Sequence, residues 1–151
     1  MERPVRSLRS LPKATRADYR RFLSIPTRWH DNDAYGHVNN VVYYAFFDTA
    51  VNEHLIREGG LDIAADACVG LVVETQCRYR RPLAFPVTVE AGLKVEHLGT
   101  SSVVYGIGIF AQGEDEAAAE GRFVHVWVDR ASGEPVRVPE RIRAALAGLL
   151  A

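Results

Sequence analysis

The feature that most restricts the fold of this 151-residue chain is the apolar run that opens a predicted helix over residues 41–57. All seven residues from Val41 to Phe47 are apolar or aromatic, and polar side chains gather only later, where Glu53 and Arg57 stand four residues apart. A helix that is apolar nearly all round at its start is buried there. The rest of the chain must therefore supply the elements that cover it.

Most of the remaining chain is predicted to be strand. Along these segments apolar and polar side chains alternate, which is the period-2 pattern of a strand with one buried face. The last of them is apolar on both faces near its end, which indicates a central strand or a subunit contact. The predicted strands cover residues 22–29, 71–80, 87–96, 103–110 and 117–128, and a C-terminal helix covers 139–150.

One long buried helix and a run of antiparallel strands predict an α+β domain. Because no other element can cover the helix, we expect a sheet of about five strands wrapped around it. Gly106 and Gly108 share one face of a strand, where their missing side chains would let a helix or another backbone approach closely.

The charge is balanced overall but uneven along the chain. The net charge is −1 and the isoelectric point is near 6.5, which argues against general nucleic-acid binding. Residues 1–21 nevertheless carry a net charge of +5 and the remainder −6. We therefore divide the chain into a basic N-terminal extension, 1–21, and one folded domain, 22–151.

Cysteine content and hydropathy bear on location. Cys68 and Cys77 form no CxxC pair and are too few for a disulfide framework, so the expected compartment is the reducing cytoplasm. The longest apolar run, residues 41–47, is much shorter than the ~20 residues that span a bilayer, so no membrane span is expected.

Reactive side chains are densest in the loop over residues 30–40, directly before the apolar helix. Asp31, Asp33 and Gly36 match the start of a calcium loop, but Tyr35 and Val42 stand where oxygen ligands are required. Histidines of the loop fit no metal-ligand spacing rule, so no metal is predicted. The alternative for any such loop is that its polar residues serve turns and a helix cap, for which Asn39 or Asn40 is suited.

The helix that follows makes the loop a candidate for catalysis. A helix N-terminus carries unpaired N–H groups and about half a positive charge, which can hold a developing oxyanion. Asp33 lies several residues upstream, close enough for its carboxylate to fold back toward the same point. A carboxylate beside oxyanion donors suits acyl transfer, with the acid acting as base or nucleophile.

The segment Trp29–Asn40 followed by Tyr43 closely resembles the D-x-D-x-x-G-H-V-N-N-x-x-Y motif of the 4-hydroxybenzoyl-CoA thioesterase-like acyl-CoA thioesterases. Weaker similarity extends through residues 79–83 and 98–102. The resemblance implies a hotdog fold, dimers formed by edge-to-edge pairing of sheets and often tetramers, with each active site at the dimer interface.

The resemblance also assigns roles to residues. The family's catalytic aspartate falls on Asp33, and the amide that polarises the thioester carbonyl falls on Asn40 or Val41. Tyr43 matches a pocket-lining position, whereas His37 and Asn39 match residues expected to shape the loop. The expected substrate-binding residues are His37, Asn39, Tyr43, Arg78, Arg81 and Ser101.

The expected function is therefore hydrolysis of an acyl-CoA to a carboxylic acid and CoA, without a cofactor, by a homo-oligomer. A non-catalytic acyl-CoA binding protein on the same scaffold and, less favoured, a hydratase remain open alternatives. No G-x-S-x-G nucleophile elbow is present, and the G-x-G-x-x-A pattern at 106–111 lacks the helix that a dinucleotide site needs. The acyl group stays undetermined.

Overall fold

The computed structural model describes residues 12–151, so Arg3, Arg6 and Arg9 of the basic extension lie outside the described residues. One five-stranded sheet has the order β1-β3-β4-β5-β2, and every neighbouring pair is antiparallel. The elements are β1 (Arg21–Pro26), α1 (Val42–Arg57), β2 (Cys68–Tyr79), β3 (Thr88–Leu98), β4 (Ser102–Ala111), β5 (Ala119–Asp129) and α2 (Glu140–Ala147), with single 3-10 turns at Arg16–Asp18 and Trp29–Asp31. The predicted α+β hotdog architecture is confirmed.

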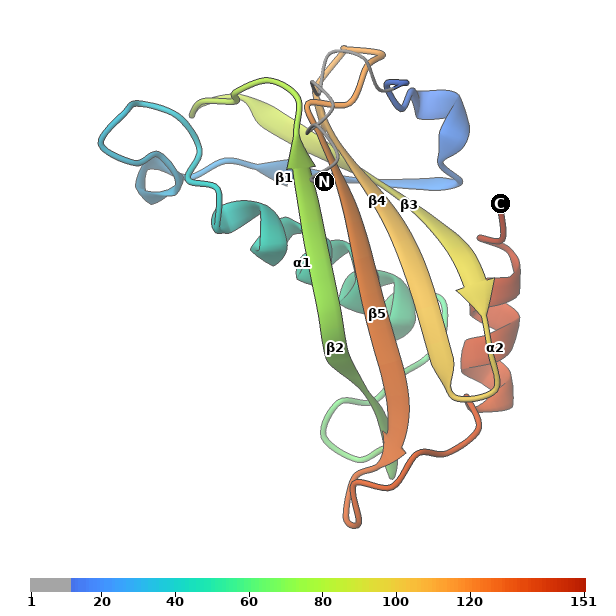
Figure 1. Cartoon of the computed structure of the whole chain (residues 1–151). Helices are drawn as coiled ribbons and strands as arrows, with labels where there is room; N and C mark the ends of the chain where they lie inside the picture. The colour runs from blue at the N-terminus through green and yellow to red at the C-terminus, as the bar shows by residue number, and fades with distance from the viewer. Residues whose placement is uncertain (1–11) are drawn as a thin grey trace, which may run out of the picture.

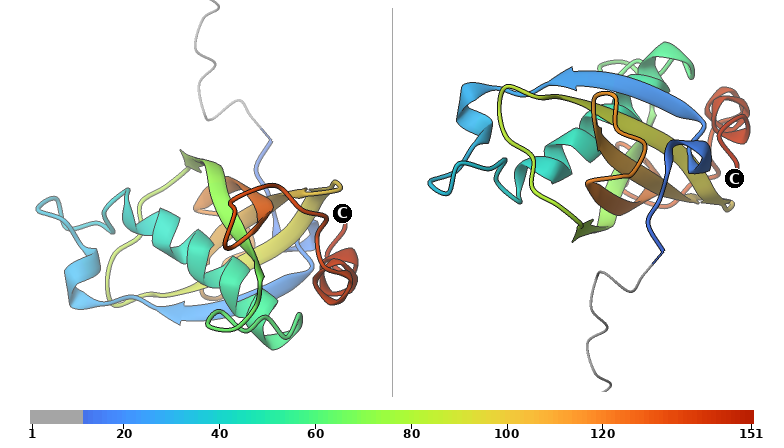
Figure 2. Two further views of the ribbon diagram at one scale, coloured as in Figure 1. Left: turned by 90° about the horizontal axis from the view of Figure 1, so that it is seen from below. Right: turned by 90° about the horizontal axis from the view of Figure 1, so that it is seen from above.

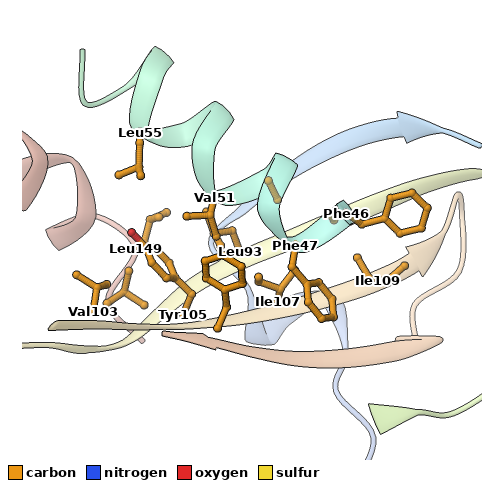
Figure 3. Close-up of a cluster of buried hydrophobic side chains, with 14 of the residues drawn as sticks. Phe46, Phe47, Val51, Leu55, Leu93, Val103, Tyr105, Ile107, Ile109 and Leu149 are labelled. Carbon is orange, nitrogen blue, oxygen red and sulfur yellow. The ribbon is translucent and has the colours of Figure 1, made fainter. Parts of the chain in front are cut away.

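The helix α1 lies against the concave face of the curved sheet (Figures 1 and 2). Its buried face points Phe47, Val51 and Leu55 toward side chains of β3 and β4 (Figure 3). Gly121 of β5 allows this close packing, because a Cβ atom there would overlap the Phe47 ring. Burying a large apolar side chain of this kind contributes roughly 1.5–3 kcal/mol, so this layer supplies most of the core.

The opposite side of α1 is less covered than the sequence predicts. Val41 is 62% exposed, and Ala45 and Asp48 are also exposed. A single sheet curls around only part of the helix circumference, which leaves this side open. Tyr44, Ala45 and Asp48 border a hollow of about 320 Å³ whose other wall is formed by Val72, Thr75 and Phe123.

The convex face of the sheet is covered by the segment that precedes β1. Tyr19 packs in edge contact with Phe110, and its ring lies where a Cβ of Gly92 or Gly108 would stand, at 2.9 and 2.6 Å. The glycine in β4 therefore does permit a close approach, but by an aromatic side chain and not by a helix or a backbone. Residues 12–21, placed by the sequence in the basic extension, are thus part of the folded structure.

Strand β2 forms one edge of the sheet. Leu71, Val72 and Val73 are 50%, 47% and 59% exposed. Its pairing with β5 shifts between Val72 and Glu74, so Val73 is the extra residue of a bulge. A long apolar edge strand offers unpaired backbone groups to a second chain. Strand β5, which is apolar on both faces, lies inside the sheet. Of the two predictions made for it, a central strand or a subunit contact, this position agrees with the first.

Two boundaries differ from the sequence prediction. Trp29 does not extend β1, because the strand ends at Pro26 and the chain enters a 3-10 turn stabilised by the Asp31 carboxylate. Helix α2 is shorter than predicted and begins directly after Pro139. None of the described helices is both long enough and apolar enough to cross a bilayer.

Candidate active site

The loop between β1 and α1 is held by a buried carboxylate. Asp31 is 2% exposed and accepts hydrogen bonds from the Arg28 backbone N–H at 2.7 Å and from two guanidinium nitrogens of Arg28 at 2.9 and 3.1 Å. Its carbonyl oxygen accepts the N–H of Asn39 at 2.8 Å. Asp31 therefore fixes both the entry and the exit of the loop.

Two further hydrogen bonds tie the loop to the segment after β2. The Phe85 backbone N–H donates to the side-chain oxygen of Asn32 at 2.9 Å, and the Val38 N–H donates to the Leu83 carbonyl at 2.7 Å. Since Asn32 directly precedes Asp33, the position of Asp33 is set by a contact distant in sequence.

Asp33 is half-buried and stands at the turn of the loop. Its N–H donates to the His37 carbonyl at 2.9 Å, and one carboxylate oxygen accepts the Tyr35 N–H at 2.9 Å. The carboxylate borders an open cavity of about 360 Å³, the first cavity. Of the predicted site residues, Asp33, His37, Asn40, Tyr43 and Arg81 all line it, and Val38, Tyr79, Arg80 and Pro82 complete its wall.

The start of α1 distinguishes the two amides that the sequence proposed as oxyanion donors. The Val41 N–H donates to the side-chain oxygen of Asn39 at 3.1 Å, and the Val42 N–H donates to the Asn39 carbonyl at 2.9 Å. The Asn40 N–H has no acceptor within residues 12–151. Asn39 thus engages the N–H groups of Val41 and Val42, whereas Asn40 lines the first cavity and carries an N–H without an acceptor among the described residues.

Two tyrosines close the apolar side of the first cavity. Tyr43 and Tyr79 are in edge contact, with ring centroids 5.0 Å apart, and the Tyr79 hydroxyl donates to the Asn40 carbonyl at 2.7 Å. Burial raises the pKa of Tyr43 to about 12 and raises that of Tyr79 as well. Both phenols stay neutral near pH 7, so neither can serve as the base beside Asp33.

The predicted substrate-binding residues Arg78, Arg81 and Ser101 lie in different parts of the structure. Arg81 lines the first cavity while donating to the Glu116 carbonyl at 2.8 Å. Arg78 borders a different hollow, of about 290 Å³, on the convex face with Tyr19 and Lys94. Ser101 lies in the turn before β4, at the end of the sheet opposite to Tyr79, because Ser102 pairs with Val126 while Tyr79 pairs with Ala119.

Sequence reasoning missed Tyr79 and Asn32 as parts of this site. Tyr79 belongs to a recognisable segment, but only the alternation of β2 could have shown that it points to the same side as Cys77. Asn32 gave no local signal, since its side chain is bonded to the distant residue Phe85. Among residues 12–151, no cluster of three or more acidic, histidine or cysteine side chains could hold a metal ion.

Comparisons with known proteins agree with this fold. Residues 27–146 match the model of a thioesterase-like superfamily. The PA5185 protein of Pseudomonas aeruginosa PAO1 is 56% identical with a TM-score of 0.92, and the alignment covers 93% of this chain and 98% of that one.

Two further crystal structures are named as thioesterases or as candidates for that activity. The PA2801 protein of Pseudomonas aeruginosa, a candidate thioesterase, is 34% identical with a TM-score of 0.77, over 84% of this chain and 98% of that one. A Thermus thermophilus thioesterase complexed with coenzyme A and Zn is 29% identical with a TM-score of 0.73, over 87% and 95%. The chain belongs to the thioesterase-like superfamily.

Proposed function

We propose that this protein hydrolyses acyl-CoA thioesters to a carboxylic acid and CoA, with Asp33 as the catalytic carboxylate. The observation that carries the proposal is that Asp33 lines one cavity together with Asn40, whose N–H has no acceptor among the described residues. A nucleophile or base on one side of a carbonyl and an oxyanion donor on the other are the two groups that acyl transfer requires.

Two mechanisms fit this pair. In the first, the Asp33 oxygen attacks the thioester carbon, the C–S bond breaks to release the CoA thiolate, and water hydrolyses the resulting anhydride. In the second, Asp33 takes a proton from a water molecule whose oxygen attacks the same carbon, and the tetrahedral intermediate then collapses with cleavage of the C–S bond, which releases the CoA thiolate and the carboxylic acid. In both, negative charge develops on the carbonyl oxygen, and the Asn40 N–H at the positive end of α1 stabilises it.

Coenzyme A as the thiol part of the substrate is supported by two observations. The Thermus thermophilus relative was crystallised with coenzyme A. In this chain, Arg81 lies in the wall of the first cavity, where a cationic group suits a phosphate-bearing ligand.

The working unit in this proposal is a homo-oligomer paired through the edges of β2. Leu71, Val72 and Val73 are exposed on this edge, and the neighbouring hollow between α1 and β2 is open to the same side. Antiparallel pairing of two β2 edges would cover both features, and it would bring the start of one β2 toward the Tyr79 end of the other. A second protomer would thus complete the wall beside Asp33.

Thiol release from a panel of acyl-CoAs tests the activity directly. We expect Asp33→Asn to lower turnover by about 10²–10⁴-fold, as removal of a general acid-base group does, with acyl-CoA affinity and fold largely unchanged. Glu134→Gln, at an exposed acid in the turn after β5, serves as the control and keeps full activity. Equal turnover by Asp33→Asn and the unchanged protein would refute the role of Asp33.

The edge pairing is tested by Val73→Lys, which places a charge on the edge of β2. We expect this variant to sediment as a smaller species than the unchanged protein and to lose thiol release with it. Leu150→Lys, at an exposed apolar residue beside β3 and far from β2 in the strand order, is the control and keeps the oligomer. An unaltered sedimentation coefficient for Val73→Lys would exclude this interface.

A further inference from the structure

Asp33 borders a second cavity besides the first. This second cavity has a volume of about 320 Å³ and is lined by Trp29, His30, Asn32, Asp33 and Gly36. Asp33, the proposed catalytic residue, is therefore the residue that the two cavities share. A thioester carbonyl has two substituents, the acyl group and the sulfur of CoA, and two spaces that meet at Asp33 could receive one each.

Trp29 forms the apolar wall of the second cavity. Its side chain is 74% exposed, which is unusual for an indole in a rigid turn, and its ring meets the edge of Phe85 with centroids 5.8 Å apart. The Phe85 N–H is bonded to Asn32, the neighbour of Asp33. Trp29 and Asp33 are consequently held in a fixed relation by one pair of contacts, so the second cavity is formed before any ligand binds.

Charge decides which substituent enters which cavity. The first cavity carries Arg81 in its wall, whereas the guanidinium of its neighbour Arg80 is buried against the Glu120 carboxylate. Asn40, whose N–H has no acceptor within residues 12–151, also lines the first cavity. The residues that line the second cavity include no lysine or arginine within the described part of the chain. The phosphate-bearing CoA portion thus matches the first cavity, and the uncharged acyl group matches the second, with the carbonyl between them.

We infer that Trp29 is a specificity-determining residue that packs its indole against the acyl group of the substrate. This inference rests on the proposed thioester hydrolysis and adds to it the class of acyl group. A volume of about 320 Å³ is at the lower end of the range for small-molecule sites. The second cavity accordingly favours compact acyl groups, branched or containing a single ring, over long linear chains.

A binding experiment tests the inference without turnover. Isothermal titration compares CoA with its phenacyl thioether, which carries a phenyl ketone but no thioester bond. We expect the unchanged protein to bind the thioether about tenfold more tightly than CoA, from aromatic packing and burial. Trp29→Ala removes this ratio, Trp29→Phe retains most of it, and the control Tyr35→Ala, an 88% exposed aromatic residue of the same loop outside the cavity, retains all of it.

A ratio that survives in Trp29→Ala, or that is absent from the unchanged protein, overturns the assignment of Trp29. Since no bond is broken in this experiment, its result stands apart from whether Asp33 supports hydrolysis. Where hydrolysis is observed, kcat/KM of Trp29→Ala should fall about tenfold for benzoyl-CoA and less than about twofold for acetyl-CoA. An equal fall for both substrates, or hexadecanoyl-CoA as the preferred substrate of the unchanged protein, contradicts the inference.

Discussion

Two buried polar regions of this molecule are built in opposite ways. In the loop before α1, the Asp31 carboxylate is 2% exposed and every bond it accepts comes from Arg28. In the sheet, His125 is 1% exposed and its Nδ1 atom has no hydrogen-bond partner among the described residues. The Tyr105 hydroxyl and the Trp127 indole N–H, close to His125, also lack partners there.

The difference separates two consequences of burying polar groups. Where partners are supplied, as at Asp31, burial fixes the backbone of the loop that carries Asp33. Where partners are missing, as at His125, burial costs stability and couples it to pH. The loop therefore uses its polar groups for geometry, whereas the aromatic cluster in the sheet holds polar groups that apolar ones could replace.

The largest expected loss of stability comes from a substitution at Asp31. Asp31→Asn removes the charge that accepts three donors of Arg28, and hydrogen bonds to charged groups contribute about 1.5–3 kcal/mol. We expect the free energy of unfolding to fall by about 2–3 kcal/mol in urea denaturation. Thiol release should fall too, since the loop carries Asp33. A variant as stable as the unchanged protein would show that the Arg28 contacts contribute nothing.

The second test removes the unpartnered nitrogen at His125. Burial lowers the pKa of His125 to about 4, from an ordinary value of 6.5. The unfolded chain thus takes up a proton at higher pH than the folded chain, so the stability from neutral His125 is present above pH 6.5 and is lost as the pH falls toward 4. For His125 this loss amounts to about 2 kcal/mol between pH 7 and pH 5.

We expect His125→Phe to flatten this dependence when urea midpoints are compared at pH 7 and pH 5, with thiol release unchanged. The pKa of His54 is also lowered, mainly by burial, so a smaller dependence of the same sign will persist. Equal slopes with pH in the variant and the unchanged protein would show that His125 is not the source.

The smallest expected effect is on kcat/KM, from a substitution at Tyr79 within the site. Tyr79→Phe deletes the hydroxyl that donates to the Asn40 carbonyl at 2.7 Å. A hydrogen bond of this kind contributes about 1 kcal/mol, so kcat/KM should fall roughly fivefold with KM nearly constant. Tyr35→Phe, at an exposed hydroxyl, should change neither parameter. A change in KM alone for Tyr79→Phe would mean that the hydroxyl binds substrate and does not orient Asn40.

Local sequence signals predicted the positions of the helices and strands well, and the contacts that their side chains make less well. The helix was predicted over residues 41–57 and spans Val42–Arg57, because an apolar run and the glycine pair after it are both local features. The candidate site residues Asp33 and Asn40 lie seven residues apart in a single motif. The structure places both at the first cavity, and their catalytic roles stay a prediction.

The features that sequence reasoning missed depend on side-chain contacts and directions that strand periodicity did not reveal. The direction of Arg78 away from the first cavity follows from the alternation of β2, whereas Arg81 lies beyond the strand end and turns toward it. Trp29 leaves the predicted strand because Asp31 captures the Arg28 N–H. Gly108 of β4 indicated a close approach, but no local sequence signal identified Tyr19 as the side chain that packs there.

The seat of Tyr19 over Gly92 and Gly108 has a practical consequence for producing this protein. A recombinant fragment that begins at residue 22, the domain boundary drawn from charge alone, would lack Tyr19 and would expose the backbone of Gly92 and Gly108 that its ring covers. Purification tags and cleavage sites therefore belong upstream of Ala14, where they leave Tyr19 in place.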